Sequence, residues 1–120
     1  MAELNFRSTV SALTESRNTM YSPVTGMLNS AVLHFPTGCN SLVEVFIYVY
    51  SRQLLPYPAV GAGASDNGIA LDDATQSFSI SESIGQGEPI EVVVNNHDAG
   101  FPHTISAIVL IEEEQKYTGP

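Results

Sequence analysis

The sequence has little cysteine, little positive charge and no tryptophan: among 120 residues it contains one cysteine and four basic side chains. Because the single Cys39 permits no disulfide within the chain, a small disulfide-stapled scaffold is excluded and a reducing compartment is favoured. No apolar run approaches the roughly 18 residues that a membrane span needs. The first residues, MAELNFRSTV, lack the basic start and apolar stretch of a secretory signal. We therefore expect no membrane partner.

The charge balance is strongly acidic. Thirteen acidic residues face four basic ones, for a formal net charge of -9 at pH 7. Binding to a nucleic-acid backbone depends on lysine and arginine displacing counterions, and four scattered bases cannot form such a footprint. An anionic membrane surface is a poor partner for the same reason. The charge is compatible with a basic protein partner or a cation, and we expect no nucleic-acid partner.

The composition is that of a folded single domain. Hydrophobic residues make up 43% of the chain and charged residues only 14%, which is too apolar and too weakly charged for a disordered protein. No linker, repeat or low-complexity block divides the sequence. We expect one domain spanning residues 1–120, with an N-terminal arm at about 1–20 and a C-terminal tail at 113–120.

Apolar and polar residues alternate with a period of two in most of the chain, whereas helical periodicity is scarce. The clearest strand segments are 75–83, 88–95 and 104–112; residues 27–35 and 42–50 follow, and 4–10, 18–22 and 69–72 are weaker. Turn residues punctuate these segments at the spacing typical of a sandwich. The sequence predicts an all-β, antiparallel β-sandwich of seven or eight strands with jelly-roll or Greek-key connections.

The segment 42–50, LVEVFIYVY, is apolar on both faces. One face carries an aliphatic row, and the other is mainly aromatic through Phe46, Tyr48 and Tyr50, interrupted only by Glu44. A strand that is covered on both sides lies centrally in a sheet, and its second face needs a loop, an arm or a partner over it. We therefore take Phe46, Tyr48 and Tyr50 as a candidate interface.

Three histidines and an aspartate raise the question of a metal site. His34, His97 and His103 each lie at a strand end near a turn, and Asp98 lies beside one of them. No pair has the close spacing of a zinc motif, and the histidines fall in two separate loops. Imidazoles at such positions more often hydrogen-bond to loop backbone, so we predict no metal site and no cofactor.

Two further sets of residues could be interpreted as a nucleophile and as a calcium site. Cys39 lies five residues from His34, but a nucleophilic thiolate also needs a third orienting group, and free cysteine is more often a small buried hydrophobe. Acidic and amide side chains around a long loop could ligate calcium, but their spacing differs from that of an EF-hand; they are Asp66, Asn67, Asp72 and Asp73. We predict no catalytic residue and no enzyme.

Two motifs carry a family resemblance: HFPTGCNSLVEVFIYV at 34–49 and FPHTISAIVL at 101–110. Across about residues 27–111 the chain resembles small, jelly-roll-like capsid decoration or accessory structural proteins of tailed bacterial or archaeal viruses. The family has no catalytic residues to carry over, and its pattern does not include the long loop at 56–68.

The resemblance implies a virion structural protein that decorates or cements a capsid by protein–protein contacts. Its partner would be the major capsid protein or another virion protein, and its own state a homotrimer that packs Phe46, Tyr48 and Tyr50 near a subunit interface. It would be synthesised in the host cytoplasm and sit on the outer capsid surface. The alternative is a carbohydrate- or ligand-binding β-sandwich module of a tail or surface adhesin.

Overall fold

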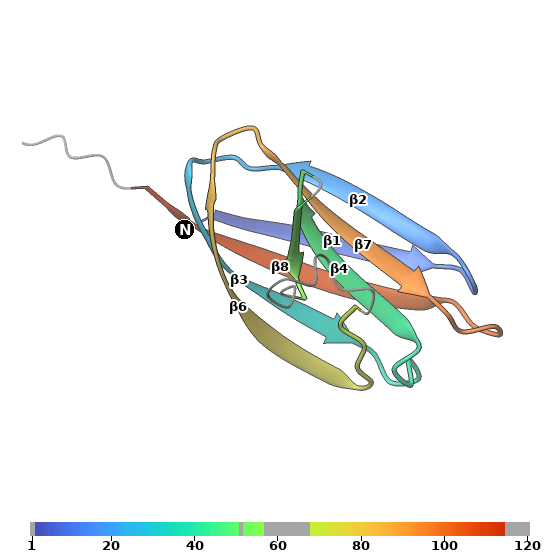
Figure 1. Cartoon of the computed structure of the whole chain (residues 1–120). Helices are drawn as coiled ribbons and strands as arrows, with labels where there is room; N and C mark the ends of the chain where they lie inside the picture. Colours follow the sequence, from blue (N-terminus) through green and yellow to red (C-terminus); the bar gives the residue numbers. More distant parts are fainter. Residues whose placement is uncertain (1, 51, 57–67, 115–120) are drawn as a thin grey trace, which may run out of the picture.

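A computed structural model describes residues 2–50, 52–56 and 68–114, and these ranges contain eight β-strands and no helix (Figure 1). The strands are β1 (Ala2–Val10), β2 (Glu15–Tyr21), β3 (Gly26–Phe35), β4 (Val43–Val49), β5 (Arg52–Leu55), β6 (Ala74–Ile84), β7 (Pro89–Asn96) and β8 (His103–Glu113). The predicted all-β class and number of strands are confirmed. The described ranges hold no helix long and apolar enough to cross a membrane.

The strands form two antiparallel sheets of four. The first sheet has the order β1-β8-β3-β6 and the second the order β2-β7-β4-β5. Every connection passes from one sheet to the other except that between β4 and β5, which are neighbours in the second sheet. This order is that of an eight-stranded jelly roll, so the predicted architecture is confirmed in its jelly-roll form.

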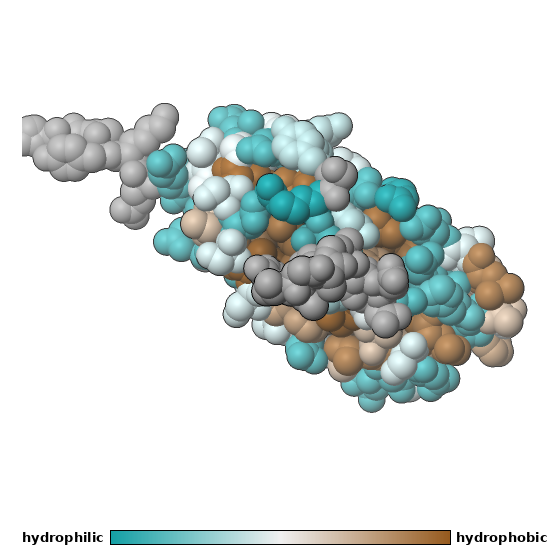
Figure 2. All heavy atoms as spheres, in the orientation of Figure 1, coloured by the Kyte–Doolittle hydropathy of each residue, from teal (hydrophilic) through white to brown (hydrophobic). Residues whose placement is uncertain are grey.

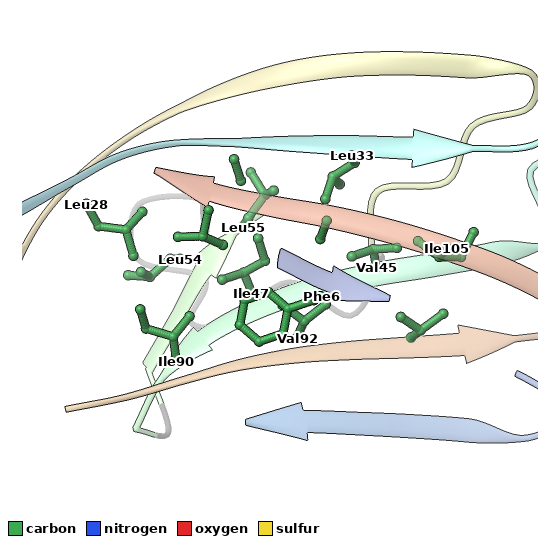
Figure 3. Packing of buried hydrophobic residues seen from close by; sticks show 14 of the residues in the cluster. Phe6, Leu28, Leu33, Val45, Ile47, Leu54, Leu55, Ile90, Val92 and Ile105 are labelled. Atoms are coloured by element: carbon green, nitrogen blue, oxygen red, sulfur yellow. The ribbon is translucent and has the colours of Figure 1, made fainter. Parts of the chain in front are cut away.

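The core lies between the sheets because alternate residues of each strand point inward. The predicted aliphatic row of β4 (Val43, Val45, Ile47 and Val49) is fully buried there. Figure 3 shows Val45 and Ile47 of β4 in this core together with Val92 of the neighbouring β7. Phe6 and Ile105 of the first sheet lie in the same cluster. Burying about twenty such side chains, at roughly 25 cal/mol per Å² of apolar area, is the main force holding the sheets together.

The expected N-terminal arm is corrected by the structure. Residues 2–10 form β1, which pairs along its whole length with β8, and residues 15–21 form β2, which pairs with β7. Phe6 and Val10 of β1 are part of the core. These segments are therefore edge strands of the chain's own two sheets.

Two other segments differ from the sequence-based expectation. Residues 52–55 form the short strand β5, which was not predicted, and the predicted strand at 69–72 is reduced to a single bridge between Val45 and Ile69. The first two residues of the expected tail at 113–120 are held by the fold. Glu113 is the last residue of β8, and the Glu114 N–H donates to Thr25 O at 2.9 Å. Residues 115–120 lie outside the described ranges.

The turns at 11–14, 36–42 and 97–102, together with residues 68–73, gather at one end of the sandwich, which we call the loop end. At the opposite end the chain turns from β6 to β7 at residues 85–88. Gly87 has a φ of +86° there and its N–H donates to Ser22 O at 2.8 Å. A side chain would make this backbone conformation unfavourable, so glycine is required in that turn.

Candidate functional site

The loop end brings together most of the titratable residues that the sequence analysis singled out. Asp98 and His103 flank the β7–β8 turn, and His97 reaches Glu44 at the start of β4. His34 is separate: it lies on the outer face of the first sheet, where its Nδ1 is 2.7 Å from Thr75 Oγ1. The three histidines are thus held by three different partners and do not share one site.

Asp98 and His103 form a nearly buried pair that supports the turn. His103 Nε2 lies 2.8 Å from Asp98 Oδ2, while Asp98 Oδ1 accepts the Gly100 N–H at 2.8 Å. The pKa of the Asp98 carboxyl is held below its ordinary value, first by the Gly100 backbone hydrogen bond and then by the hydrogen bond from His103. Because both carboxylate oxygens of Asp98 already have partners in the turn, the pair acts as a structural brace.

The buried Asn96 side chain ties two turns together. Its Nδ2 donates to Val10 O at 3.0 Å and to Phe101 O at 3.0 Å, and its Oδ1 accepts the Asp98 N–H at 2.9 Å. A buried amide left without such partners would destabilise the fold, and here donor and acceptor are both satisfied. Sequence analysis did not single out Asn96, because the strand segment that it predicted ends at residue 95.

Glu44 fixes the chain beside β4. One carboxylate oxygen is 2.5 Å from His97 Nε2 and the other accepts the Gly68 N–H at 2.6 Å. Next to it, Val45 and Ile69 exchange two backbone hydrogen bonds of 2.9 and 3.0 Å. The one charged residue in the segment 42–50 therefore anchors residues 68–69 against the second sheet.

Cys39 lies in the core of the sandwich. The side chain is fully buried and belongs to the same hydrophobic cluster as Phe35. Burial raises the pKa of the Cys39 thiol, and the negative charges of Asp72 and Asp98 raise it further. A buried, protonated thiol is a poor nucleophile, and His34 is engaged on the opposite face of its strand.

The proposed calcium ligands are only partly described. Asp66 and Asn67 lie outside the described residues. Asp72 Oδ1 accepts the N–H groups of Gly38 and Asn40, at 3.0 and 2.9 Å, and so closes the β3–β4 turn. In the described ranges, no group of three or more histidine, cysteine, aspartate or glutamate side chains is placed to hold a metal ion.

The predicted interface residues lie on the outer face of the second sheet or at its end. Phe46 and Tyr48 stack, with ring centroids 6.2 Å apart and an interplanar angle of 27°. Phe46 is only 7% exposed, because Val93 pairs beside it on β7 and Gly68 approaches its ring. A Cβ on Gly68 would lie 3.0 Å from Phe46 Cε2, which is tighter than most contacts of a Cβ atom. The chain itself thus supplies part of the cover that the sequence analysis required.

Two exposed tyrosines extend this surface. Tyr21 ends β2 opposite Pro89 and is 66% exposed, and Tyr50 follows the last residue of β4 and is 65% exposed. Tyr50 has a φ of +54°, so it has left the strand and the strict alternation that the sequence predicted for it. We call Tyr21, Phe46, Tyr48, Tyr50 and Val93 the aromatic surface.

Charged residues also lie on this face, between Tyr48 of β4 and the strand β2. Arg17, which lies opposite Val93, donates from Nη1 to Glu91 Oε1 at 2.9 Å and from Nη2 to Glu15 Oε1 at 3.1 Å. Sequence reasoning missed Val93 and Tyr21. The alternation of 88–95 placed Val93 on the polar row, and residues 18–22 gave only a weak strand signal. The Ser22-Pro23 sequence that follows β2 is a local sign of a strand end there.

The loop end also exposes two apolar side chains. Leu13 has a φ of +57° and its N–H donates to Asp98 O at 3.2 Å, so the β1–β2 and β7–β8 turns lie side by side. Leu13 and Phe101 are both exposed there, and Figure 2 shows hydrophobic atoms at this end of the molecule. This small apolar patch was not predicted and is separate from the aromatic surface.

Comparison with known proteins gives a likeness of fold. No protein-family model matches the sequence, and the search of curated proteins finds no match. The chain is similar to the Yersinia pseudotuberculosis-derived mitogen, with a TM-score of 0.56 and 13% identity, over 98% of this chain and 92% of that one. At this identity the likeness shows a shared fold alone.

Two further solved structures show a more distant likeness. FlhE matches with a TM-score of 0.43 and 13% identity, over 91% of this chain and 96% of that one. PliG of Aeromonas hydrophila, a periplasmic inhibitor of g-type lysozyme, matches with a TM-score of 0.42 and 10% identity, over 90% and 86% of the two chains. Neither likeness bears on the function of this chain.

Proposed function

We propose that this chain is a virion structural protein that decorates a capsid and attaches by protein–protein contacts through the aromatic surface. The observation that supports the proposal is the chemistry of the second sheet: it carries the Phe46–Tyr48 stack, and Tyr21 at the end of β2 and Tyr50 after β4 are exposed. Tyrosine and phenylalanine are enriched at protein interfaces, where they bury a large area with few rotatable bonds. The capsid as partner follows from the resemblance of residues 34–49 and 101–110.

The surface is preorganised for binding. Phe46 is packed under Gly68 and beside Val93, so the ring of Tyr48 rests on a fixed neighbour. The ion pairs of Arg17 order the charged side chains that lie between Tyr48 and β2. Side chains that are already ordered lose less entropy on association, which raises affinity without additional contacts.

The charge of the chain indicates how it would sit on a particle. With -9 per chain, a position on the outer surface keeps the protein away from the phosphates of a packaged genome. Attachment to a basic patch would weaken as salt rises, since exposed charges more than roughly 10 Å apart are screened at 0.1 M salt. Attachment that does not change with salt would indicate that the aromatic surface dominates.

The test is co-sedimentation with empty capsids assembled from the major capsid protein encoded near this gene. The double variant Tyr48→Ala, Tyr50→Ala should lose about tenfold or more in affinity, because central interface aromatics often contribute 2 kcal/mol or more. Thr104→Ala, on the outer face of the first sheet, is the matched control and should bind like the unmodified chain. Equal binding by all three proteins would contradict the proposed surface.

The proposal contains no catalytic step. Cys39→Ser and His103→Ala should therefore leave attachment intact once any loss of stability is accounted for. A selective loss of biological activity in a folded, attached variant would contradict this part of the proposal. A glycan array with clear hits that Tyr50→Ala abolishes would favour the carbohydrate-binding alternative, because exposed tyrosine rings also stack on sugars.

A further inference from the structure

Strand β6 forms one edge of the first sheet. It is eleven residues long and, within the described ranges, β3 is its one hydrogen-bonded neighbour. The corresponding edge of the second sheet, β5, has only four residues. A long edge strand exposes a row of unpaired N–H and C=O groups that can pair with another strand, and charge or proline usually blocks this. In β6 the one charged residue is Glu82, and it is engaged by Arg52 of β5.

The sequence of β6 is chemically symmetric about Ser79. Residues 75–83 read TQSFSISES, and the pairs at equal distance from Ser79 match in kind: serine with serine, phenylalanine with isoleucine, glutamine with glutamate, and threonine with serine. In an antiparallel pair related by a twofold axis, residue i of one copy faces its mirror position in the other, so the strand must be complementary to itself. Symmetry about Ser79 meets this requirement along the whole strand.

The described residues cover the inner face of β6 incompletely. Phe78 and Ile80 point toward the core but remain half-buried, and a cavity of about 640 Å³ opens between β5 and β6, lined in part by Leu54, Leu55 and Ile80. The pairing register between β3 and β6 shifts between Leu28 and Ser30 of β3. The side chains of β6 nevertheless alternate between the inner and outer faces on both sides of this shift. A second strand laid along this edge would place its Ile80 beside Phe78, and its Phe78 beside Ile80, on the uncovered side.

The polar positions fit the same arrangement. Gln76 would face Glu82 of the other copy, so that the amide of Gln76 could donate to the carboxylate that Arg52 already holds. On the outer face, the exposed serines and threonine would face one another as hydroxyl pairs, which are favourable across strands. Each pair would occur twice, once on each side of the axis.

We propose that β6 pairs with β6 of a second copy of this chain, antiparallel and about a twofold axis at Ser79, so that two four-stranded sheets become one continuous sheet of eight strands. The contact lies on the first sheet and leaves the aromatic surface of the second sheet free. It therefore goes beyond the proposed function and stands independently of it. It also replaces a homotrimer packed through Phe46, Tyr48 and Tyr50 with a dimer as the state of the purified chain.

Disulfide trapping tests the axis directly. Facing residues of antiparallel strands have Cα atoms about 4.5–5.5 Å apart, within the range that a disulfide spans. Ser79→Cys should cross-link to a covalent dimer under mild oxidation. Ser77→Cys is the matched control, because its copies would lie about four residues apart along the strands, roughly 13 Å, and should not cross-link. Both serines are exposed, and the natural Cys39 is buried. Equal cross-linking of both variants would overturn the proposal.

Analytical ultracentrifugation tests the assembly without a covalent bond. The unmodified chain should sediment as a dimer at high micromolar concentration. Ser79→Lys and Ser79→Glu should each raise the dissociation constant about fivefold or more, since like charges would face each other on the axis, and an equimolar mixture should recover the dimer. Far-UV circular dichroism checks that each variant is folded. A monomeric or trimeric unmodified chain, or a mixture that does not recover, would overturn the proposal.

Discussion

The outer faces of the two sheets differ sharply, although the strands of both alternate in the same way. On the second sheet, Phe46 and Val93 are buried and stand beside Tyr48. On the first sheet, the edge strand β6 presents a row of exposed hydroxyl side chains, and β8 carries Ile108 only half-buried between Asn5 and Val32. Neither outer row is needed to fill the core, so the chemistry of these rows reflects what each face contacts.

The difference follows from the course of the chain at residues 68–69. The Val45–Ile69 bridge and the Gly68–Glu44 hydrogen bond hold this segment beside β4, and Gly68 then shields Phe46. The first sheet has no comparable segment among the described residues. The aromatic side chains of β4 therefore have a partial cover within the chain, whereas β6 of the first sheet carries small polar side chains on its outer face.

The largest expected effect comes from removing the edge strands on which both faces depend. Deleting residues 2–18 takes away β1 and most of β2, including the core residues Phe6 and Val10. Loss of one buried phenylalanine already costs about 3–5 kcal/mol, comparable with the whole stability of many domains. We expect no cooperative thermal transition in circular dichroism. A cooperatively folded chain without these residues would restore the interpretation of 1–20 as an arm.

The contrast between the faces is tested by truncating one apolar side chain on each. Phe46→Ala should lower the free energy of unfolding by about 3 kcal/mol, because the residue is nearly buried and contacts Tyr48 and Gly68. Ile108→Ala, at a half-buried position of β8, should cost about 1 kcal/mol. Urea unfolding measures both. Equal losses would show that the two outer faces are packed alike.

The role of Gly68 as a close cover is tested next. In Gly68→Ala the new methyl group would lie 2.9 Å from Glu44 Cβ and 3.0 Å from both Phe46 Cε2 and Val45 O. Crowding of this kind costs about 1–2 kcal/mol. Gly100→Ala is the matched control, since its methyl group would meet only Asp98 Oδ1, at 3.7 Å. Equal stability of the two variants would contradict the close contact with Phe46.

A smaller effect should appear in the pH dependence of stability at the loop end. The pKa of Asp98 is lower in the folded chain than its ordinary value of 3.8, so its contribution is complete above that value and disappears as the pH falls through the folded pKa. The thermal midpoint of the unmodified chain should therefore drop more steeply below about pH 4 than that of Asp98→Asn. Parallel pH profiles for the two proteins would exclude this contribution.

Much of the fold follows from local alternation, and the exceptions have physical causes. Segments 75–83, 88–95 and 104–112 correspond closely to β6, β7 and β8, because apolar residues recur with a spacing of two on their inward faces. The strand β5 was missed because RQLL is short, is apolar at consecutive positions and ends at Pro56.

The edge strands β1 and β2 were weak in the sequence for another reason. Their inward rows contain polar residues that satisfy one another between the sheets. Asn18 Nδ2 donates to Ser8 Oγ, and Ser16 Oγ donates to Ser8 Oγ at 3.4 Å. Polar residues in the inward row hide the period of two, and for this reason the segment was taken for an arm.

The aromatic surface was predicted in part. Phe46 and Tyr48 follow from the alternation of 42–50, and the structure stacks them as neighbours on one face. Tyr21 could not be assigned to the same surface, because its proximity depends on β2 pairing with β7, a contact between residues far apart in the chain. Nor could the covering role of Gly68 be predicted, since it depends on the bridge to Val45.

Cryo-electron microscopy of the particle that carries this chain tests the central claim most directly. The account predicts that Tyr48 and Tyr50 of the second sheet face the capsid protein, and that the hydroxyl-bearing outer face of the first sheet faces solvent. Docking through the first sheet, with Tyr48 and Tyr50 turned to solvent, would contradict it.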